Sequence, residues 1–188
     1  MKTVYLILGA IGSGKSLIAD FILSDPIFKN VEYVGSDIYK KKFFDQDSKN
    51  KKSGYRCADE LAFHRIEQIC KSKADFFYEF CPTNSNKIET IKYLLRKYGY
   101  TVKAFFIGTE NKEINVNRCL LRERGGGDSV SVEKVRNRYD EALIRVIEMA
   151  DFSHKMYFID NSAKFILNME QVIINLDGTS YHKLKIFS

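Results

Sequence analysis

Apolar and polar positions alternate along this chain with two periods, one typical of buried strands and one typical of amphipathic helices. Short runs rich in β-branched and aromatic residues predict strands buried within a sheet. Between them, apolar residues return every three or four positions, which is the spacing of one helix face. The predicted strands are residues 3–8, 31–35, 74–80, 101–107 and 156–160. The predicted helices run from Lys15 to a stop at Ser24-Asp25-Pro26 and over residues 55–73, 85–98, 112–124 and 132–150.

Three stretches are less regular. Residues 38–44 predict a helical turn or two, and the polar run 45–52 has no apolar period and predicts a solvated loop. The tail, residues 164–188, alternates short apolar and polar segments around Asp177-Gly178, which predicts a small hairpin or edge strands.

Strands that alternate with helices predict an α/β fold: a doubly wound parallel sheet with helices on both faces. In such folds, ligands bind at the carboxyl ends of the strands. At 188 residues, the chain fits a single domain over residues 1–188 that can bury a continuous core.

The amino-acid composition further limits the class of protein to which this chain can belong. Hydrophobic residues make up 45% and charged residues 29%, as in ordinary globular proteins. No apolar run approaches the roughly 20 residues that span a membrane, and the chain enters its first strand directly, so neither a membrane partner nor a signal peptide is expected. The four cysteines are scattered without a C-x-x-C pair, which argues against a disulfide or metal framework and favours the reducing cytoplasm.

The net charge of +6 suits phosphate-bearing ligands, although most of the excess is expected on solvated surface. Basic and aromatic residues do not interleave as they do where bases stack, so nucleic acid is not expected as a partner. The three histidines have no partner at metal-ligand spacing.

The first predicted strand leads into a segment of the form G-x-x-x-x-G-K-[ST], the phosphate-binding loop of P-loop NTPases. Its glycines let successive backbone N–H groups turn toward a phosphate, and the helix that follows adds its positive end. Lys15 is expected to reach the β- and γ-phosphates and Ser16 to ligate Mg²⁺. The predicted ligands are therefore ATP and Mg²⁺, bound by Gly9, Ala10, Ile11, Gly12, Ser13, Gly14, Lys15 and Ser16.

Two carboxylates lie where the fold predicts a ligand. Asp37 follows the second strand, beside the loop, where it could accept the proton of an acceptor hydroxyl or help to hold Mg²⁺. The alternative is a helix N-cap. Glu79 lies within an apolar strand, where an ionised carboxylate is costly unless it is paired, so we predict a functional role over a solvent-facing position.

Arginines form the third group. Arg118 and Arg122 are four apart and share a helix face, and a triple glycine, residues 125–127, separates them from Arg136 and Arg138. This pattern predicts a mobile lid over about residues 118–138 that brings guanidinium groups to a transferring phosphoryl group. Arg136 and Arg138 are two apart on a helix and should point in different directions; a solvated basic face is the alternative for any one of them.

These residues together resemble the zeta-toxin group of small P-loop kinases. Besides the loop, the resemblance rests on Gly35-Ser36-Asp37, Phe77-Tyr78-Glu79, the Gly-Gly pair before Arg138-Tyr139, and Asp160-Asn161-Ser162, and it covers residues 3–162. Members phosphorylate a sugar hydroxyl of UDP-N-acetylglucosamine with ATP, or are kinases whose acceptor is unknown. The resemblance implies Asp37 as the base toward the acceptor, Glu79 as a carboxylate that contacts it, and the arginines as phosphate clamps. It also implies an antitoxin protein as a partner.

The chain departs from the family pattern on the acceptor side. Asp128 and Ser131 stand where short members often have His and Pro, and Cys81 replaces a Thr two residues after the strand carboxylate. The residues expected to bind the nucleotide match the family pattern, so the departures bear on the identity of the acceptor and on any toxicity.

The sequence therefore predicts an ATP-dependent kinase with a small-molecule acceptor, a nucleotide sugar such as UDP-N-acetylglucosamine being one candidate. Its catalytic residues are expected to be Lys15, Asp37, Arg122 and Arg138, with Arg118 at the nucleotide and Asp37 and Glu79 at the acceptor. The alternative is a module that binds or hydrolyses ATP as a sensor, because a P-loop does not prove transfer. A GTPase is disfavoured because Asn111-Lys112-Glu113-Ile114 lacks the Asp that selects guanine, and a motor ATPase because no strand ends in Asp-Glu.

Overall fold

The protein, described here by a computed structural model of residues 2–39, 51–162, 169–175 and 181–186, is built on one sheet of seven strands; the side chains described are those of residues 2–39 and 57–162. The strand order is β2-β3-β1-β4-β5-β6-β7. The strands are β1 (Thr3–Leu8), β2 (Glu32–Gly35), β3 (Phe76–Phe80), β4 (Thr101–Gly108), β5 (Lys155–Asp160), β6 (Met169–Asn175) and β7 (Tyr181–Ile186).

The first five strands are parallel, with β1 in the centre between β3 and β4. The predicted doubly wound parallel sheet is therefore confirmed. The tail adds β6 antiparallel to β5, and β7 antiparallel to β6, so it is both a hairpin and an edge of the sheet. Asp177-Gly178 lies outside the described residues.

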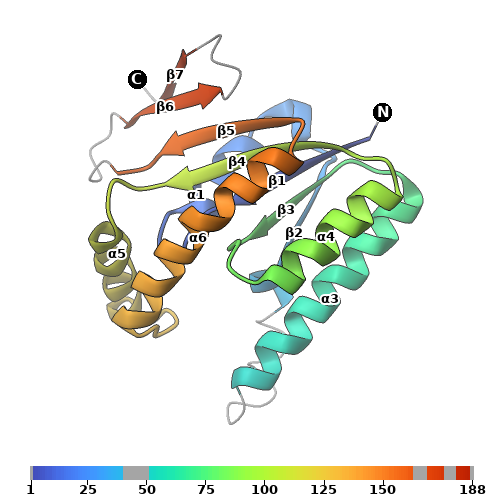
Figure 1. The fold of residues 1–188 in the computed structure, drawn as a ribbon. Helices are drawn as coiled ribbons and strands as arrows, with labels where there is room; N and C mark the ends of the chain where they lie inside the picture. The colour runs from blue at the N-terminus through green and yellow to red at the C-terminus, as the bar shows by residue number, and fades with distance from the viewer. Residues whose placement is uncertain (1, 40–50, 163–168, 176–180, 187–188) are drawn as a thin grey trace.

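Helices cover both faces of the sheet. Figure 1 shows α3, α4 and α6 on one face and α1 on the other, with α5 packed beside α6 at one end. Residues 36–39 are also helical. The bounds are α1 (Lys15–Leu23), the 3-10 turn η1 (Pro26–Phe28), α3 (Lys51–Ser72), α4 (Ser85–Lys97), α5 (Lys112–Arg124) and α6 (Val132–Phe152).

Helix boundaries differ from the sequence prediction where helices extend into polar residues. α3 begins at Lys51, four residues before the predicted start, so the last two residues of the predicted loop 45–52 are helical. Lysine is a good helix former without being buried, whereas the apolar period marks only the buried part of a helix. Of the predicted turn at 38–44, residues 38 and 39 are helical and the remainder lies outside the described residues.

The core is divided between the two faces of the sheet. On the face under α3, α4 and α6, the strands contribute alternate residues such as Leu6, Tyr78 and Phe106 to one large cluster. On the other face, Ile7 and Phe77 pack with Ile18 of α1. Since β1 is buried on both faces, its sequence is apolar at nearly every position, as expected of a central parallel strand.

Several apolar positions that the helical pattern placed inside are exposed. On α6, Ala142 and Val146 are buried, but Leu143 and Ile147 are 42% and 67% exposed. Leu17 of α1 and Leu61 of α3 are exposed in the same way. A residue next to a buried one is turned by about 100° on a helix, and here that rotation carries it beyond the buried stripe.

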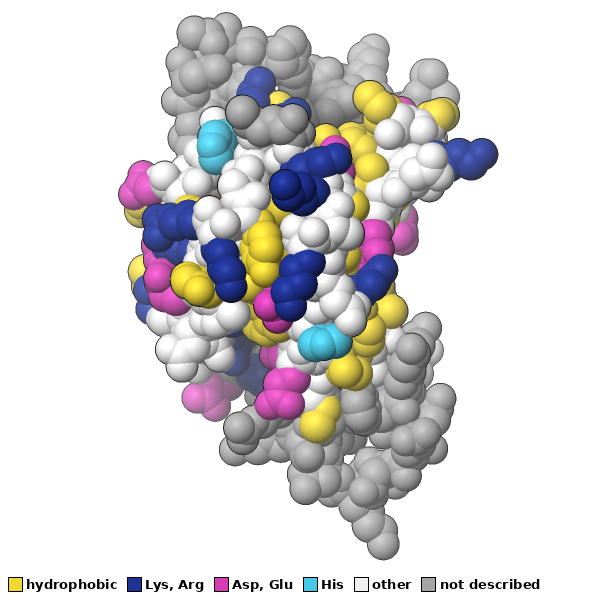
Figure 2. Space-filling model, turned by 90° about the vertical axis from the view of Figure 1, so that its right-hand side faces the viewer, with side chains coloured by type: hydrophobic (Ala, Val, Ile, Leu, Met, Phe, Trp, Pro, Cys, Tyr) yellow, Lys and Arg dark blue, Asp and Glu magenta, His cyan; other side chains and the backbone are white. Residues whose placement is uncertain are grey.

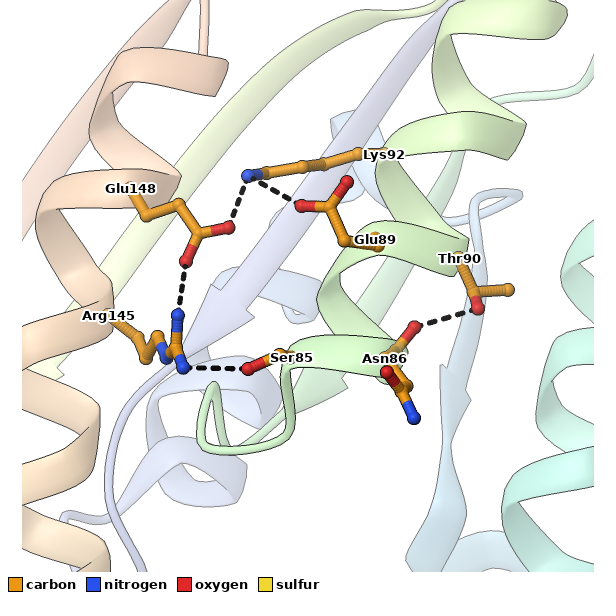
Figure 3. A network of polar contacts seen from close by, with 7 residues as sticks. All are labelled: Ser85, Asn86, Glu89, Thr90, Lys92, Arg145 and Glu148. Carbon is orange, nitrogen blue, oxygen red and sulfur yellow. Dashed lines mark hydrogen bonds and ion pairs between the residues drawn. The ribbon is translucent and has the colours of Figure 1, made fainter.

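Charged side chains join α6 to α4 (Figure 3). The buried ammonium of Lys92 donates to Glu148 at 2.5 Å and to Glu89 at 3.3 Å. Arg145 donates to Glu148 at 3.1 Å and to the hydroxyl of Ser85 at 2.6 Å. The two helices are thus held together by a connected set of ionic contacts over the sheet.

The basic excess is spread over the surface. Figure 2 shows the side of the molecule that carries α3 and α4, where Lys and Arg side chains stand apart from one another among polar, acidic and apolar ones. Among the helices that the structure describes, none has the length and apolar character needed to cross a membrane.

Candidate active site

The loop between β1 and α1 leaves a helix N-terminus open to a ligand. Gly12 and Gly14 have positive φ angles of 78° and 90°, which side chains other than glycine rarely adopt. Gly14 is the N-cap of α1 and has no side chain to occupy the first N–H groups, and the first turn of the helix carries no acidic residue. These N–H groups and the positive end of the helix therefore favour an anion at this point.

Two buried amides hold the loop from either side. Asn115 of α5 donates to the carbonyl of Ile11 at 2.8 Å, and Asn161, which follows β5, donates to the carbonyl of Ser13 at 2.8 Å. Both asparagines pack against the loop glycines, Asn161 with its side chain and Asn115 with its backbone. A Cβ on Gly14 would lie 2.3 Å from Nδ2 of Asn161, and one on Gly12 would lie 2.6 Å from the backbone oxygen of Asn115. The loop thus needs glycine both for its backbone angles and for these close approaches.

Lys15 and Ser16 occupy the first turn of α1. The ammonium of Lys15 donates to the carbonyl of Ala10 at 2.9 Å, so its side chain is folded back over the loop. The hydroxyl of Ser16 lies at the other side and donates to Oε1 of Glu79 at 3.2 Å. Oε2 of the same carboxylate accepts a hydrogen bond from the phenol of Tyr33 on β2.

A second polar cluster lines the wall beyond β2. The hydroxyl of Ser36 donates to Asp59 of α3, and Lys87 of α4 donates to Asp59 at 2.6 Å and to Ser36 at 3.2 Å. Asp37, next to Ser36, is exposed at the rim of the cleft. The end of β2, α3 and α4 therefore bring hydroxyl, carboxylate and ammonium groups to this wall.

The arginines take different directions. Arg118 donates to the backbone oxygen of Asn161 at 2.7 Å, and burial lowers the pKa of its guanidinium while Asp160 opposes that shift. Arg138 donates to the hydroxyl of Thr83, whereas Arg136 points away and pairs with Glu113 at 2.8 Å. As predicted from their spacing, Arg136 and Arg138 do not share a direction.

One cleft of about 660 Å³ connects these groups. Among the predicted site residues, its lining includes Ile11, Gly12, Gly14, Lys15, Ser16, Asp37, Glu79, Arg118, Arg122 and Arg138. Gly9, Ala10 and Ser13 do not line it: the side chains of Ala10 and Ser13 are buried beneath the loop. The predicted lid corresponds to the end of α5, the connection 125–131 and the start of α6; its motion stays a prediction.

Sequence reasoning missed several residues of the cleft and its supports. Asn161 could have been found, because it directly follows a parallel strand at the carboxyl edge where ligands bind. Tyr33, Asp59, Lys87 and Asn115 gave no such signal, since each lies inside an element and acquires its role only from residues far away in the sequence.

The oxygen groups at Ser16 fit a hard divalent cation. The Ser16 hydroxyl and the Glu79 carboxylate are in contact, and both line the cleft together with Asp37. Mg²⁺ binds through a few protein oxygens together with phosphates and water, and not in a cage made by protein alone. In keeping with this, the described residues contain no group of three or more His, Cys, Asp or Glu that could hold a metal.

The sheet order, the open helix N-terminus and the loop clamped against its glycines define a P-loop protein with a kinase-like fold. A family model for the zeta toxin matches residues 1–175, and the chain belongs to this family. No curated protein matches the sequence.

Solved structures share the fold at low sequence identity. The chain is similar to a protein from a study of the PezAT chromosomal toxin-antitoxin system of Streptococcus pneumoniae (14% identity, 85% of this chain and 69% of that chain, TM-score 0.68). It is also similar to a chain of the AvrRxo1-ORF1:-ORF2 structure with ATP (15%, 97% and 60%, TM-score 0.67). The shikimate kinase of Acinetobacter baumannii in complex with shikimate matches with 15% identity over 87% and 84% of the chains, at a TM-score of 0.53.

Proposed function

We propose that this protein is an ATP-dependent kinase that transfers the γ-phosphoryl group of ATP to a hydroxyl of a small acceptor. The observation that carries the proposal is that one cleft holds a phosphate-binding loop, an exposed carboxylate and three arginines. A sensor would need the loop but would have no use for a carboxylate placed to accept a hydroxyl proton. The solved complex with ATP in a protein of similar fold supports ATP as the donor.

Each residue has one task in the proposed reaction. The loop N–H groups and Lys15 hold the β- and γ-phosphates, and Arg118, Arg122 and Arg138 stabilise the charge on the transferring group. The acceptor oxygen bonds to the γ-phosphorus as the bond from that phosphorus to the bridging oxygen breaks, and ADP leaves. The acceptor proton passes to Asp37.

Mg²⁺ would be held by Ser16 and the nucleotide phosphates, where it would neutralise negative charge on the phosphates. Glu79 is proposed to contact the acceptor, as the family resemblance implies, and its contact with Ser16 gives it a further role considered below.

The side of the cleft lined by Ser36, Asp59 and Lys87, which we call the acceptor wall, favours a polyhydroxylated acceptor. Ser36 directly precedes Asp37, and together with Asp59 and Lys87, which it contacts, it supplies both donors and acceptors. Such mixed groups suit sugar hydroxyls. UDP-N-acetylglucosamine is the first candidate because members of the family use it.

The experiment is a screen of nucleotide sugars and small alcohols for acceptor-dependent release of ADP. One acceptor should raise ADP release well above the rate with ATP alone. Lys15→Ala should lower that turnover by at least about 10²-fold without unfolding the chain, because it removes a charge that follows the phosphoryl group. Equal turnover of the variant and the parent would contradict the site. Tight ATP binding without any acceptor-dependent turnover would favour the sensor.

We further propose a protein antitoxin as partner and the cytoplasm, where ATP is supplied, as the location. The antitoxin is supported by the toxin-antitoxin system named for a structural relative. Expression in bacteria should arrest growth with the parent chain and not with Lys15→Ala if the activity is toxic; equal growth of both strains would count against an antitoxin.

A further inference from the structure

Tyr33 and Glu79 form a polar contact on the face of the sheet where Ile7, Phe77 and Ile18 pack together. In the parallel register of β2 and β3, Tyr33 stands opposite Phe77 and Gly35 stands opposite Glu79. Alternate residues of a strand share a face, so Tyr33 and Glu79 lie diagonally on the face covered by α1. The Tyr33 phenol crosses this diagonal and donates to Oε2 of Glu79.

Gly35 makes room for this contact. A Cβ built on Gly35 would lie 3.6–3.8 Å from the ring edge and hydroxyl of Tyr33, so the ring lies over the glycine. Such a distance is ordinary contact for one methyl group, but a larger side chain would displace the ring. The absence of a side chain at the end of β2 is thus matched to the direction of the phenol.

The other carboxylate oxygen of Glu79 accepts the hydrogen bond from Ser16, 3.2 Å away. Both oxygens of Glu79 are therefore oriented, one by the tyrosine and one by the residue expected to bind Mg²⁺. A carboxylate in a partly buried strand position needs such partners to offset the loss of water.

We infer that Tyr33 is a positioning residue for the divalent cation: it fixes Glu79 so that the carboxylate faces the Ser16 hydroxyl where the cation of the nucleotide complex binds. This inference rests on the proposed function only in that it assumes a nucleotide bound with a cation. Glu79 then lies between the site of the cation and the site of the entering acceptor.

The electrostatic surroundings support this assignment. Burial, followed by the charge of Glu79, raises the pKa of Tyr33 far above its usual value. The phenol therefore stays a hydrogen-bond donor to Glu79 throughout the physiological range.

The test uses Tyr33→Phe, which removes one hydroxyl and keeps the ring. Calorimetry would measure binding of a non-hydrolysable ATP analogue, once in EDTA and once with saturating Mg²⁺, and Mn²⁺ binding to the nucleotide complex would be followed by electron paramagnetic resonance. We expect affinity in EDTA to stay unchanged. The affinity for Mn²⁺ should fall about 10- to 100-fold, as is typical when the partner of a metal-site carboxylate is lost.

Two further variants show whether Tyr33 acts through Glu79. Tyr157→Phe is the matched control, because Tyr157 lies on the same face of the sheet and stacks on Phe105, away from the cleft; it should change nothing. Glu79→Gln should also weaken Mn²⁺ binding, and adding Tyr33→Phe to it should have little additional effect, since residues that act as a unit are not additive.

Three results would overturn the inference: equal losses of nucleotide affinity with and without metal, additive effects of Tyr33→Phe and Glu79→Gln, or unchanged Mn²⁺ binding. Because every readout is a binding measurement, failure to find an acceptor would contradict the kinase proposal alone and leave this result standing.

Discussion

Asp37 is an exposed carboxylate at the rim of the cleft. Glu79 is held by Tyr33 and Ser16, and Asp59 by Ser36 and Lys87. Asp37 directly follows β2, at the carboxyl edge of the parallel sheet where ligands bind, so an entering hydroxyl can reach its exposed carboxylate. The positions of these three carboxylates therefore support Asp37 as the residue that takes the proton of the acceptor.

Asp37→Asn tests that assignment, because the amide keeps the shape of the side chain and its capping ability but cannot take a proton. We expect ATP affinity close to that of the parent and acceptor turnover reduced by roughly 10²- to 10⁴-fold. Asp151→Asn, an exposed position of α6 outside the cleft lining, is the control. Both quantities would be measured on one preparation; undiminished turnover of Asp37→Asn would leave a structural role only.

Single residues also show where sequence reasoning stops. The spacing of Gly9, Gly14 and Lys15 was enough to predict the loop, because its geometry is local. The amides that clamp the loop could not be predicted in the same way, since Asn115 is separated from Ile11 by 104 positions and Asn161 from Ser13 by 148. Nothing in the sequence around Asn115 distinguishes an asparagine that will hold a distant loop from one on the surface of a helix.

At the scale of elements, α6 connects the cleft to the body of the protein. Its first half carries Arg138 toward Thr83, and its second half is joined to α4 by Lys92, Glu148 and Arg145 (Figure 3). A helix fixed in this way presents its arginine in one direction, while the glycine connection before it supplies any motion.

The register of α6 predicts opposite results for two neighbouring arginines. Arg138→Ala should lower kcat by on the order of 10²-fold and change ATP affinity little, because its charge matters most as the phosphoryl group moves. Arg136→Ala is the matched control and should be nearly silent, since it removes only an exposed pair with Glu113. Steady-state kinetics and nucleotide titration would check both. A sensitive Arg136 with a silent Arg138 would reverse the assignment.

The contact between α4 and α6 should make stability depend on pH. The hydrogen bond from Lys92, together with Arg145, lowers the pKa of Glu148 below its ordinary value of 4.5. Between pH 4.5 and the lower pKa of the folded protein, Glu148 takes up a proton in the unfolded chain but not in the folded one. The stabilisation that the Glu148 charge gives the folded protein is therefore present above pH 4.5, and it is lost as the pH falls through the folded pKa. Glu148→Gln should cost about 1 kcal/mol at neutral pH, between the values of exposed and buried pairs.

Thermal unfolding from pH 7 down to pH 3 would measure this effect. The difference between parent and Glu148→Gln should shrink as the pH falls. Glu67→Gln, which removes a solvent-exposed pair with Lys71, is the control and should be nearly silent at every pH. A difference that stays constant with pH would show that packing of Glu148, and not its charge, stabilises the contact.

Elements were predictable in kind and order, but less so at their edges and in their buried faces. Alternating apolar periods placed every strand of the parallel sheet and each of the long helices. The same periods failed at Lys51, where the helix begins before its apolar period does, and at Leu143 and Ile147, where apolar residues lie beside the buried stripe. Periodicity reports which face is apolar, whereas packing decides how wide the buried part of that face is.

At the scale of the whole molecule, fold class and donor site could be inferred because both depend on patterns within short stretches. The acceptor wall could not, because Ser36, Asp59 and Lys87 come from three parts of the chain that only the folded sheet brings together. The identity of the acceptor therefore has to come from measurement.

The central position of β1 also constrains how the chain is made. This strand leaves the ribosome before its two neighbours, β3 and β4, which are completed only at Phe80 and Gly108. Until then, the nascent chain holds an apolar strand with two unpaired edges, which is a segment that chaperones bind and that aggregates easily. Asn161, the second clamp of the phosphate loop, emerges later still. The phosphate loop is thus fully clamped only after β5 has been made, so ATP cannot guide the steps of folding that come before.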